Sequence, residues 1–356
     1  MIATGPDRHG PVTESFTVPG AGSRMMKGGR SKEVRMKAET GDLPSASAGQ
    51  GRAETVGLIT LSHRGDLERC ALLFETIDRH ATPRGCHYVI VDDEDVALFA
   101  RFARPDRHIL PLSQFLPWWM KPIPVLRWRG RRYWLTPFGK PISGWHIQQI
   151  VKIEATRRLP EARYCLIDSD IYFFRDFDLA ALAEPNPTPF HVHPGGVMEN
   201  RPRHILWIGT ASRLLRTTQQ SVPADDYIDQ IIIWDQATAR AMTDRIEAVT
   251  GHGWVGALCR DRNFSEYMIY GTFVANTPSA MARHAVTTRS YCRTHWEDDP
   301  LSESDILAML EAATPTERAF CIQSFGSTPL STIRTSIETF YSRCGVENSK
   351  RRTEAA

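Results

Sequence analysis

The chain has 356 residues, of which 42% are hydrophobic and 24% charged, and its formal net charge at pH 7 is +2. These values are typical of a globular domain, and the balanced charge does not favour a nucleic-acid partner, which would require a concentrated basic surface. No apolar run of about 18 residues or more occurs, so we expect no transmembrane segment. Because the N-terminus lacks a signal-peptide core and the seven cysteines form no CxxC pair, we expect a cytoplasmic protein.

Composition divides the chain into three parts. Residues 1–54 are rich in Gly, Ser, Ala, Arg and Lys and poor in large apolar residues, so we expect a disordered N-terminal tail. Residues 55–341 carry the apolar patterns of one folded domain. Residues 342–356 are expected to form a flexible C-terminal tail.

The domain is predicted to begin with a strand, a helix and a second strand. Val56–Leu61 is a continuous apolar run, Leu67–His80 has the single apolar stripe of an amphipathic helix, and His87–Val91 is a second apolar run. This spacing indicates a βαβ unit, which implies a parallel sheet with a right-handed crossover.

The segment 110–144 is rich in tryptophan and proline and contains the basic run Arg127–Arg132. We interpret it as an insertion or flap with a short hairpin. Its composition suits contact either with the inner face of a membrane or with an anionic glycan, and the sequence does not decide between these partners.

A helix is predicted from Trp145 to Leu159, followed by the buried strand Tyr164–Ile167. Later patterns predict a turn, a short strand and three helices, in this order: His191–Gly196, Leu206–Gly209, Tyr227–Val249, Glu266–Tyr270 and Ser302–Ala313. Ser302 and Asp305 have the spacing of a capping pair for the last of these helices.

Two carboxylates, Asp168 and Asp170, follow the strand Tyr164–Ile167 directly. Because side chains alternate along a strand, we expect both to point the same way, at the edge where open α/β sheets bind ligands. Two bare carboxylates repel each other, and a hard divalent cation carrying a phosphorylated ligand removes that repulsion. The alternative is that these aspartates only form a turn or cap a helix.

Four motifs follow one another along the domain. They are Trp145-His-Ile-Gln-Gln-Ile-Val-Lys152, Asp168-Ser-Asp170, Ser265-Glu-Tyr-Met-Ile-Tyr-Gly271 and His295-Trp296. In this order they resemble the motifs of uncharacterised bacterial glycosyltransferase-like proteins, and Asp168-Ser-Asp170 resembles the DxD motif of GT-A glycosyltransferases. The resemblance covers about residues 55–340. It implies an α/β, Rossmann-like GT-A fold: a mixed, mostly parallel sheet flanked by helices in a single catalytic domain.

The resemblance implies that Asp168, Asp170 and His295 bind Mn²⁺ or Mg²⁺ and, through it, the diphosphate of a nucleoside-diphosphate sugar. Negative charge collects on the diphosphate when the sugar–phosphate bond breaks, and a cation stabilises that charge. A histidine in a loop is otherwise more often a surface residue, and this alternative stays open for His295.

Further residues are candidate contacts for the donor nucleotide or its sugar: Thr60, Ser62 and Arg64 after the first strand, Asp92 and Asp93 after the second, and Gln149 and Lys152 on the helix before Asp168. Arginine and lysine suit phosphate, aspartate suits a base or ribose, and glutamine suits a sugar hydroxyl. The alternative in each case is a solvated side chain, although Trp145 on the face of Gln149 and Lys152 argues against a fully exposed face.

Glu266 is the candidate general base. An inverting transferase needs a carboxylate within hydrogen-bond reach of the acceptor hydroxyl, and the apolar neighbours Phe264 and Tyr267 suit a raised pKa. The alternative is a carboxylate that complements the dipole at a helix start. Gly195 and Gly196 are expected to border the sugar site, because glycine allows close approach of the backbone.

The function expected from these features is metal-dependent transfer of a hexose from a nucleoside-diphosphate sugar to a hydroxyl acceptor, either a polysaccharide, a glycolipid or a small metabolite. One alternative is a catalytically idle carbohydrate- or nucleotide-binding protein of the same fold. The other is a phosphatase of the haloacid dehalogenase type, but Tyr172 stands where that class has Thr or Val.

Overall fold

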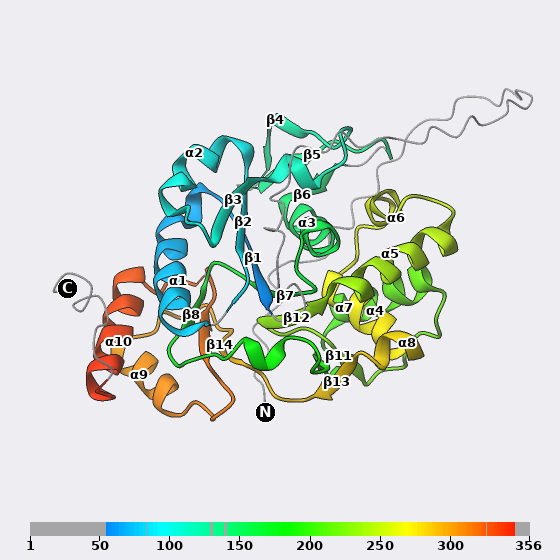
Figure 1. The fold of residues 1–356 in the computed structure, drawn as a ribbon. Coiled ribbons are helices and arrows are strands. Elements are labelled where there is room, and N and C mark those ends of the chain that lie inside the picture. Colours follow the sequence, from blue (N-terminus) through cyan, green and yellow to red (C-terminus); the bar gives the residue numbers. More distant parts are fainter. Residues whose placement is uncertain (1–54, 83, 129–130, 139–140, 325, 346–356) are drawn as a thin grey trace, which may run out of the picture.

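The computed structural model describes residues 55–345 except 83, 129–130, 139–140 and 325. Its centre is a five-stranded sheet in the order β12-β7-β1-β2-β3, in which the first strand of that order is antiparallel to its neighbour and the others are parallel (Figure 1). The strands are β1 (Val56–Ser62), β2 (His87–Val91), β3 (Arg107–Pro111), β7 (Arg163–Ile167) and β12 (Ile231–Asp235). The predicted α/β class with a mostly parallel sheet is confirmed.

Helices cover both faces of this sheet. Figure 1 shows α1 (Leu67–His80) on one side and α3 (Gly144–Arg158), α5 (Gln236–Thr250) and α7 (Glu266–Ala275) on the other. Side chains of β1 alternate between these layers: Leu58 packs in the cluster with α1, whereas Ile59 packs in the cluster with α3 and α7. Because both faces are covered, every residue of β1 and β2 is buried, which is why these strands are continuous apolar runs.

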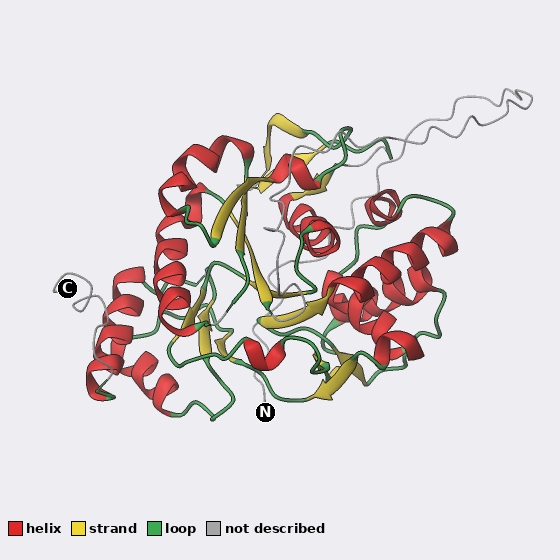
Figure 2. Ribbon diagram, viewed as in Figure 1, coloured by secondary structure: helices red, strands yellow, loops and turns green. Residues whose placement is uncertain are grey.

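A second, smaller sheet continues from β7. The chain turns at Asp168–Asp170 into β8 (Ile171–Phe173), which pairs with β15 (Ala319–Ile322), and β15 pairs with β14 (Cys292–His295). Helices α9 (Glu303–Glu311) and α10 (Leu330–Arg343) pack against this sheet (Figure 2). The predicted cap of α9 is confirmed, because Ser302 and Asp305 form a reciprocal capping box.

Three predictions between Asp178 and Thr250 are wrong. Residues 191–196 are not a turn, since β9 (Thr188–His191) and β10 (His193–Val197) occupy them. Leu206–Gly209 is not a strand but part of α4 (Pro202–Leu215). The predicted helix from Tyr227 contains β12 before α5 begins at Gln236. The sequence of a short apolar run such as Ile231–Trp234 is compatible with either a strand or a helix. In the structure this run pairs with β7 and is therefore a strand.

The segment 110–144 contains the predicted hairpin. Its strands are β4 (Pro122–Trp128), β5 (Arg131–Trp134) and β6 (Ile142–Ser143), which form an antiparallel sheet of their own (Figure 1). The segment's first two residues, Leu110 and Pro111, belong to β3 in the main sheet. The predicted N-terminal tail, 1–54, lies outside the described residues. The predicted C-terminal tail, 342–356, begins too early, because α10 continues to Arg343; residues 346–356 lie outside the described residues.

Short elements complete the fold. They are α2 (Val96–Phe99), α6 (Trp254–Arg260), α8 (Pro278–Met281), β11 (Ala224–Asp226), β13 (His284–Thr287) and the 3₁₀ turns Arg64–Asp66, Asp93–Asp95, Ala100–Phe102, Leu112–Phe115 and Ala180–Leu182. Within the described ranges, no helix is both long and apolar enough to span a bilayer.

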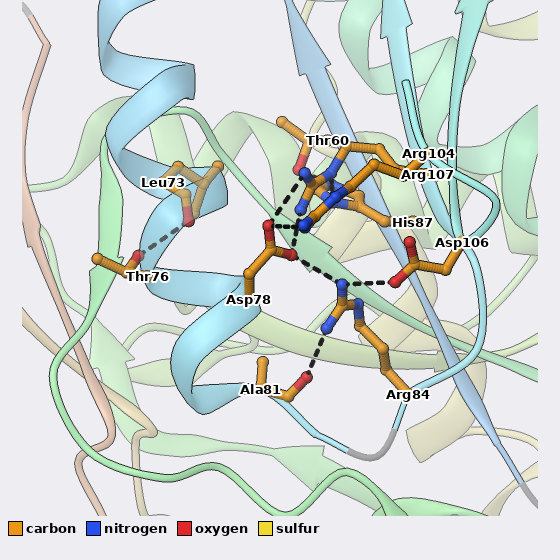
Figure 3. A network of polar contacts seen from close by, with 10 residues as sticks. All are labelled: Thr60, Leu73, Thr76, Asp78, Ala81, Arg84, His87, Arg104, Asp106 and Arg107. Atoms are coloured by element: carbon orange, nitrogen blue, oxygen red, sulfur yellow. Dashed lines mark hydrogen bonds and ion pairs between the residues drawn. The ribbon is translucent and has the colours of Figure 1, made fainter. Parts of the chain in front are cut away.

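A polar network joins α1 to the amino-terminal ends of β2 and β3 (Figure 3). Asp78 on α1 accepts hydrogen bonds from Arg84, Arg104 and Arg107. Arg107 Nε also donates to Nδ1 of the buried His87 at 3.1 Å, so Nε2 of His87 carries the proton and donates to Thr60 Oγ1 at 3.0 Å. The network therefore ties a helix to the sheet at the edge opposite Asp168.

Candidate functional site

The candidate site lies at the carboxyl end of β7. Asp168–Asp170 form a turn rather than an extension of the strand, and the amide of Ile171 donates to the carbonyl of Asp168 at 3.3 Å. Strand alternation therefore ends at Ile167, and the two carboxylates contact different layers of the molecule. Asp168 interacts with Lys152 of α3, whereas Asp170 interacts with Ser324, two residues after β15 of the small sheet.

Lys152 is the centre of the site. Its Nζ lies 3.0 Å from Asp168 Oδ1 and 3.4 Å from Glu266 Oε1, and it donates a hydrogen bond to the hydroxyl of Tyr267 at 3.0 Å. An ammonium group has three N–H donors, so these three partners can engage all of them. Lys152 is only 7% exposed. Burial alone lowers the pKa of Lys152, but Asp168, Tyr267 and Glu266 outweigh it and raise that pKa well above its ordinary value.

Glu266 begins helix α7, where Ser265 accepts a hydrogen bond from the amide of Met268 as the helix cap. The amide of Glu266 donates to Gln149 Oε1 at 3.0 Å. The residue is 4% exposed. Burial raises the pKa of its carboxyl, and the charge of Lys152 opposes that rise. α3 therefore positions Glu266 through two side chains on one helical face, Gln149 and Lys152.

Asp170 is buried, at 7% exposure, and its Oδ2 accepts a hydrogen bond from the amide of Ser324 at 2.9 Å. Burial and the neighbouring charge of Asp168 raise its pKa to about 6. In contrast, 45% of the Asp168 side chain is exposed. The pair thus offers one accessible and one enclosed carboxylate.

His295 does not contact this pair. It ends β14, separated from β8 by β15, and its ring nitrogens lie 3.1 Å from Glu297 Oε2 and 3.3 Å from the carbonyl of Asp299. Among residues 55–345 that the structure describes, no group of three or more His, Cys, Asp or Glu side chains has the geometry of a metal site. Metal binding therefore stays a prediction, with Asp168 and Asp170 as its first candidates.

Thr60 and Ser62 are not in a loop, because β1 runs to Ser62. The hydroxyl of Thr60 is buried and bonded to His87, while Ser62 Oγ accepts a hydrogen bond from Cys70 Sγ of α1 at 3.0 Å. Both hydroxyls face the α1 layer, away from Lys152. Their contact with a donor stays a prediction.

Arg64, Asp92 and Asp93 have partners within the protein. Arg64 donates through Nε to the buried Asp95 at 2.6 Å. Arg132 of the hairpin donates to Asp92 Oδ2 at 2.9 Å, and Asp93 accepts hydrogen bonds from the amide and hydroxyl of Ser113. These three residues line the adjacent edge of the sheet, and the side chain of Arg64 is largely exposed, so their contact with a nucleotide stays a prediction.

Several residues at this edge were not predicted from the sequence. Tyr267 contacts Lys152, and its position next to Glu266 was the available signal. Asp66 Oδ2 accepts a hydrogen bond from Ser169 at 3.3 Å. Asp229 Oδ2 lies 3.8 Å from His191 Nδ1, and both atoms are buried without a hydrogen-bond partner in the described structure. Asp229 precedes β12, and the incorrect helix prediction from Tyr227 concealed this position.

A protein-family profile matches most of the chain. The sequence profile of a family of unknown function, DUF6492, matches residues 53–345. A search of curated proteins finds no match.

Proposed function

The chain belongs to DUF6492, a family of unknown function, and we propose that it is a metal-dependent glycosyltransferase with a GT-A fold. It would move a hexose from a nucleoside-diphosphate sugar to a hydroxyl acceptor. The observation that carries the proposal is the contact of Lys152 with both Asp168 and Glu266 at the carboxyl edge of a mostly parallel sheet. That edge is where open α/β sheets bind ligands.

The donor atoms of the site suit a hard divalent cation. Asp168 and Asp170 supply carboxylate oxygens, and Mg²⁺ is commonly held by one or two carboxylates with substrate phosphates and water completing its shell. When ionised, Asp168, Asp170 and Glu266 outweigh Lys152 by two negative charges, which one divalent cation balances. When bound, the cation would stabilise the charge that collects on the departing diphosphate.

Lys152 acts in this proposal as a positioning residue. Because all three of its N–H donors have partners, it can reach a donor phosphate only by releasing one of them. It holds the accessible carboxylate of Asp168 and the buried carboxylate of Glu266 on either side of one ammonium group. The distance between the proposed metal ligand and the proposed base is thereby set by α3.

Glu266 is the proposed general base. The acceptor oxygen forms a bond to the anomeric carbon of the sugar while the bond from that carbon to the diphosphate oxygen breaks. The acceptor hydroxyl proton passes to Glu266, and the nucleoside diphosphate leaves with the bonding electron pair. The raised pKa of this buried carboxyl suits proton acceptance near neutral pH.

The test is a thermal-shift panel of UDP, GDP, CDP, ADP and dTDP, each with and without Mn²⁺. A ligand that binds only the native state raises the melting temperature. We expect one nucleotide to do so only with the metal, and Asp168→Asn to abolish the shift. Asp244→Asn is the matched control, because Asp244 is an exposed carboxylate on α5. If no nucleotide shifts the wild-type protein with or without Mn²⁺, the proposal fails.

Incubation with the sugar nucleotide identified in this way then separates the remaining classes of protein. Transfer of the sugar to an acceptor supports the transferase. Nucleotide binding with no transfer to any acceptor or to water indicates an idle binding protein. Release of inorganic phosphate from the free nucleoside diphosphate, which has the terminal phosphate that the sugar nucleotide lacks, indicates a phosphatase.

A further inference from the structure

The segment 110–144 presents apolar side chains to solvent that the proposed function does not use. Trp118 is 72% exposed, more than any other large hydrophobic side chain that the structure describes, and Leu135 is 53% exposed. Both lie at the base of the β4–β5 hairpin, where the amide of Leu135 donates to the carbonyl of Lys121 at 2.8 Å. The exposed Lys121 is therefore a neighbour of Leu135 and stands three residues after Trp118.

Aromatic contacts join this part of the hairpin to the end of α6. The rings of Trp119 and Phe138 pack edge to face with centroids 5.8 Å apart, and the guanidinium carbon of Arg260 lies 4.3 Å from the ring centre of Phe138. Arg260 is exposed. The aromatic rings therefore have a second cation beside them. We call the four exposed residues the hairpin surface: Trp118, Lys121, Leu135 and Arg260.

The hairpin surface is positively charged. Among the residues that the structure describes, neither Lys121 nor Arg260 pairs with a carboxylate. The acidic turn 92–95 beside the hairpin has its own cations, because Arg132 pairs with two of its carboxylates and Arg64 pairs with a third. These acids therefore do not neutralise the hairpin surface.

The composition of the segment has the same character. Residues 110–144 contain six lysines and arginines and no aspartate or glutamate. They also contain four of the nine tryptophans that precede or follow α3 in the chain. A partner for this segment has to accept apolar rings and positive charge together.

An anionic bilayer fits both properties. Indole rings favour the boundary between lipid tails and headgroups, and a leucine is stabilised when it is buried there. Lysine and arginine keep their apolar stems at that boundary while their charges reach the anionic headgroups. The sequence alone left an anionic glycan as the other partner. A glycan is held by hydrogen-bonding groups that converge in a pocket, and the exposed Leu135 side chain offers none.

We propose that the hairpin surface docks the protein on a lipid bilayer that contains anionic lipids. Trp118 and Leu135 enter the interface, and Lys121 and Arg260 contact the headgroups. This inference goes beyond the proposed transferase activity and does not rest on it. Figure 1 shows β4 and β5 far from α9 and α10, so a membrane can approach the hairpin without meeting those helices.

The test is sedimentation of the full chain with vesicles of two compositions. One is phosphatidylcholine alone, and the other contains about 30% phosphatidylglycerol, which is anionic. In about 0.1 M NaCl we expect the anionic vesicles to bind about tenfold more protein or better, and we expect this binding to weaken in about 0.5 M NaCl, because salt screens charge attraction.

Two variants test the two kinds of contact. Trp118→Ala should lower the partition coefficient onto anionic vesicles by about tenfold, because less apolar area enters the interface. Lys121→Gln should lower it by about fivefold, which is the share of one basic residue near an anionic surface. Both side chains are exposed, so both variants should melt like the wild type.

Two control variants match these changes elsewhere on the molecule. Trp296→Ala removes an indole that is 38% exposed after β14, and Arg343→Gln removes an exposed arginine of α10. Neither should change vesicle binding. The proposal is overturned if anionic vesicles bind no better than neutral ones, or if Trp118→Ala and Trp296→Ala bind vesicles alike while both melt like the wild type.

Two other occupants are tested with the same variants. Polygalacturonate is the probe for an anionic glycan. Binding to it that Trp118→Ala weakens, by a protein that binds no vesicles, overturns the proposal in favour of a glycan. Sedimentation velocity tests for a second copy of the chain. A dimer that Trp118→Ala dissociates, again without vesicle binding, overturns it in favour of self-association.

Discussion

The ammonium group of Lys152 lies between two carboxylates, 3.0 Å from Asp168 and 3.4 Å from Glu266. Asp168 is partly exposed and Glu266 is buried, so the lysine joins a solvent-facing charge to an enclosed one. Removing one member of a buried ion pair costs more than the pair itself contributes, because the remaining charge has no partner. Replacing Lys152 should therefore lower the free energy of unfolding as well as disturb the proposed metal ligand and base.

Lys152→Met should destabilise the protein by about 3–5 kcal/mol, because Glu266 is left buried without its cation. Urea denaturation at pH 7.5 measures this change in the free energy of unfolding. Lys121→Met is the control, since Lys121 is exposed, and it should have little effect. The double variant Lys152→Met/Glu266→Gln should recover part of the loss; if it is no more stable than Lys152→Met, the assigned coupling is wrong.

Glu266→Gln should spare donor binding and lose transfer. The amide keeps the size of the side chain, and the backbone contact to Gln149 does not involve the carboxyl group. Loss of a general base lowers the rate by about 10²–10⁴-fold, whereas the metal-dependent nucleotide shift should equal that of the wild type. An equal loss of nucleotide binding and transfer would make Glu266 structural instead.

Asp170→Asn should stabilise the metal-free protein at pH 8. The folded-state pKa of Asp170 is about 6 and its ordinary value is 3.8, so ionisation above pH 6 costs the folded state free energy. The gain should approach about 2–3 kcal/mol at pH 8 and disappear as pH falls toward 4, where Asp170 is protonated in both states. Melting curves in EDTA measure it. A gain that is independent of pH would contradict this account.

His87 should make the protein sensitive to acid. Burial, with the charges of Arg107 and Arg84, holds the pKa of His87 well below the ordinary value of 6.5. Below about pH 6.5 the unfolded chain therefore binds a proton at His87, whereas the folded chain does not. Stability should be level above about pH 6.5 and decrease below it, by at most about 1.4 kcal/mol per pH unit from this residue.

His87→Gln removes this titration. The variant should be less stable than the wild type at pH 7.5, and the difference in free energy of unfolding should narrow toward pH 5. Parallel pH profiles for the two proteins would show that another group causes the acid sensitivity.

Much of the central sheet could be predicted from sequence. β1, β2 and β7 are buried on both faces, so each is a continuous apolar run between polar turns. The start of α7 was also visible, because Ser265 is a cap residue before an apolar stretch. Helices α4 and α10 were not predicted. In α4, Leu206 is exposed and its neighbour Trp207 is buried. The four residues Leu206–Gly209 are too few to show the helical spacing of buried residues, so they resembled a short strand.

The site was predicted where one element determines it. Gln149 and Lys152 were expected on one helical face, and that follows from the helical period of α3 alone. The contact of Lys152 with Asp168 joins two elements and was not predicted. Arg64 and Asp92 remain predicted ligand contacts, but their partners within the protein, Asp95 and Arg132, come from other elements and were not predicted. Sequence periodicity contains no information on such pairings, and it could not show that β15 lies between His295 and β8.

The hydrogen bond from Ser324 to Asp170 joins residues 154 positions apart. During synthesis, Asp168, Lys152 and Glu266 leave the ribosome well before β15 and Ser324 do. The nascent chain can therefore build its central sheet early and still lack the backbone amide that fixes the second carboxylate. The site is completed only after Ser324 has been synthesised, so a chain released before that residue lacks the contact that fixes Asp170.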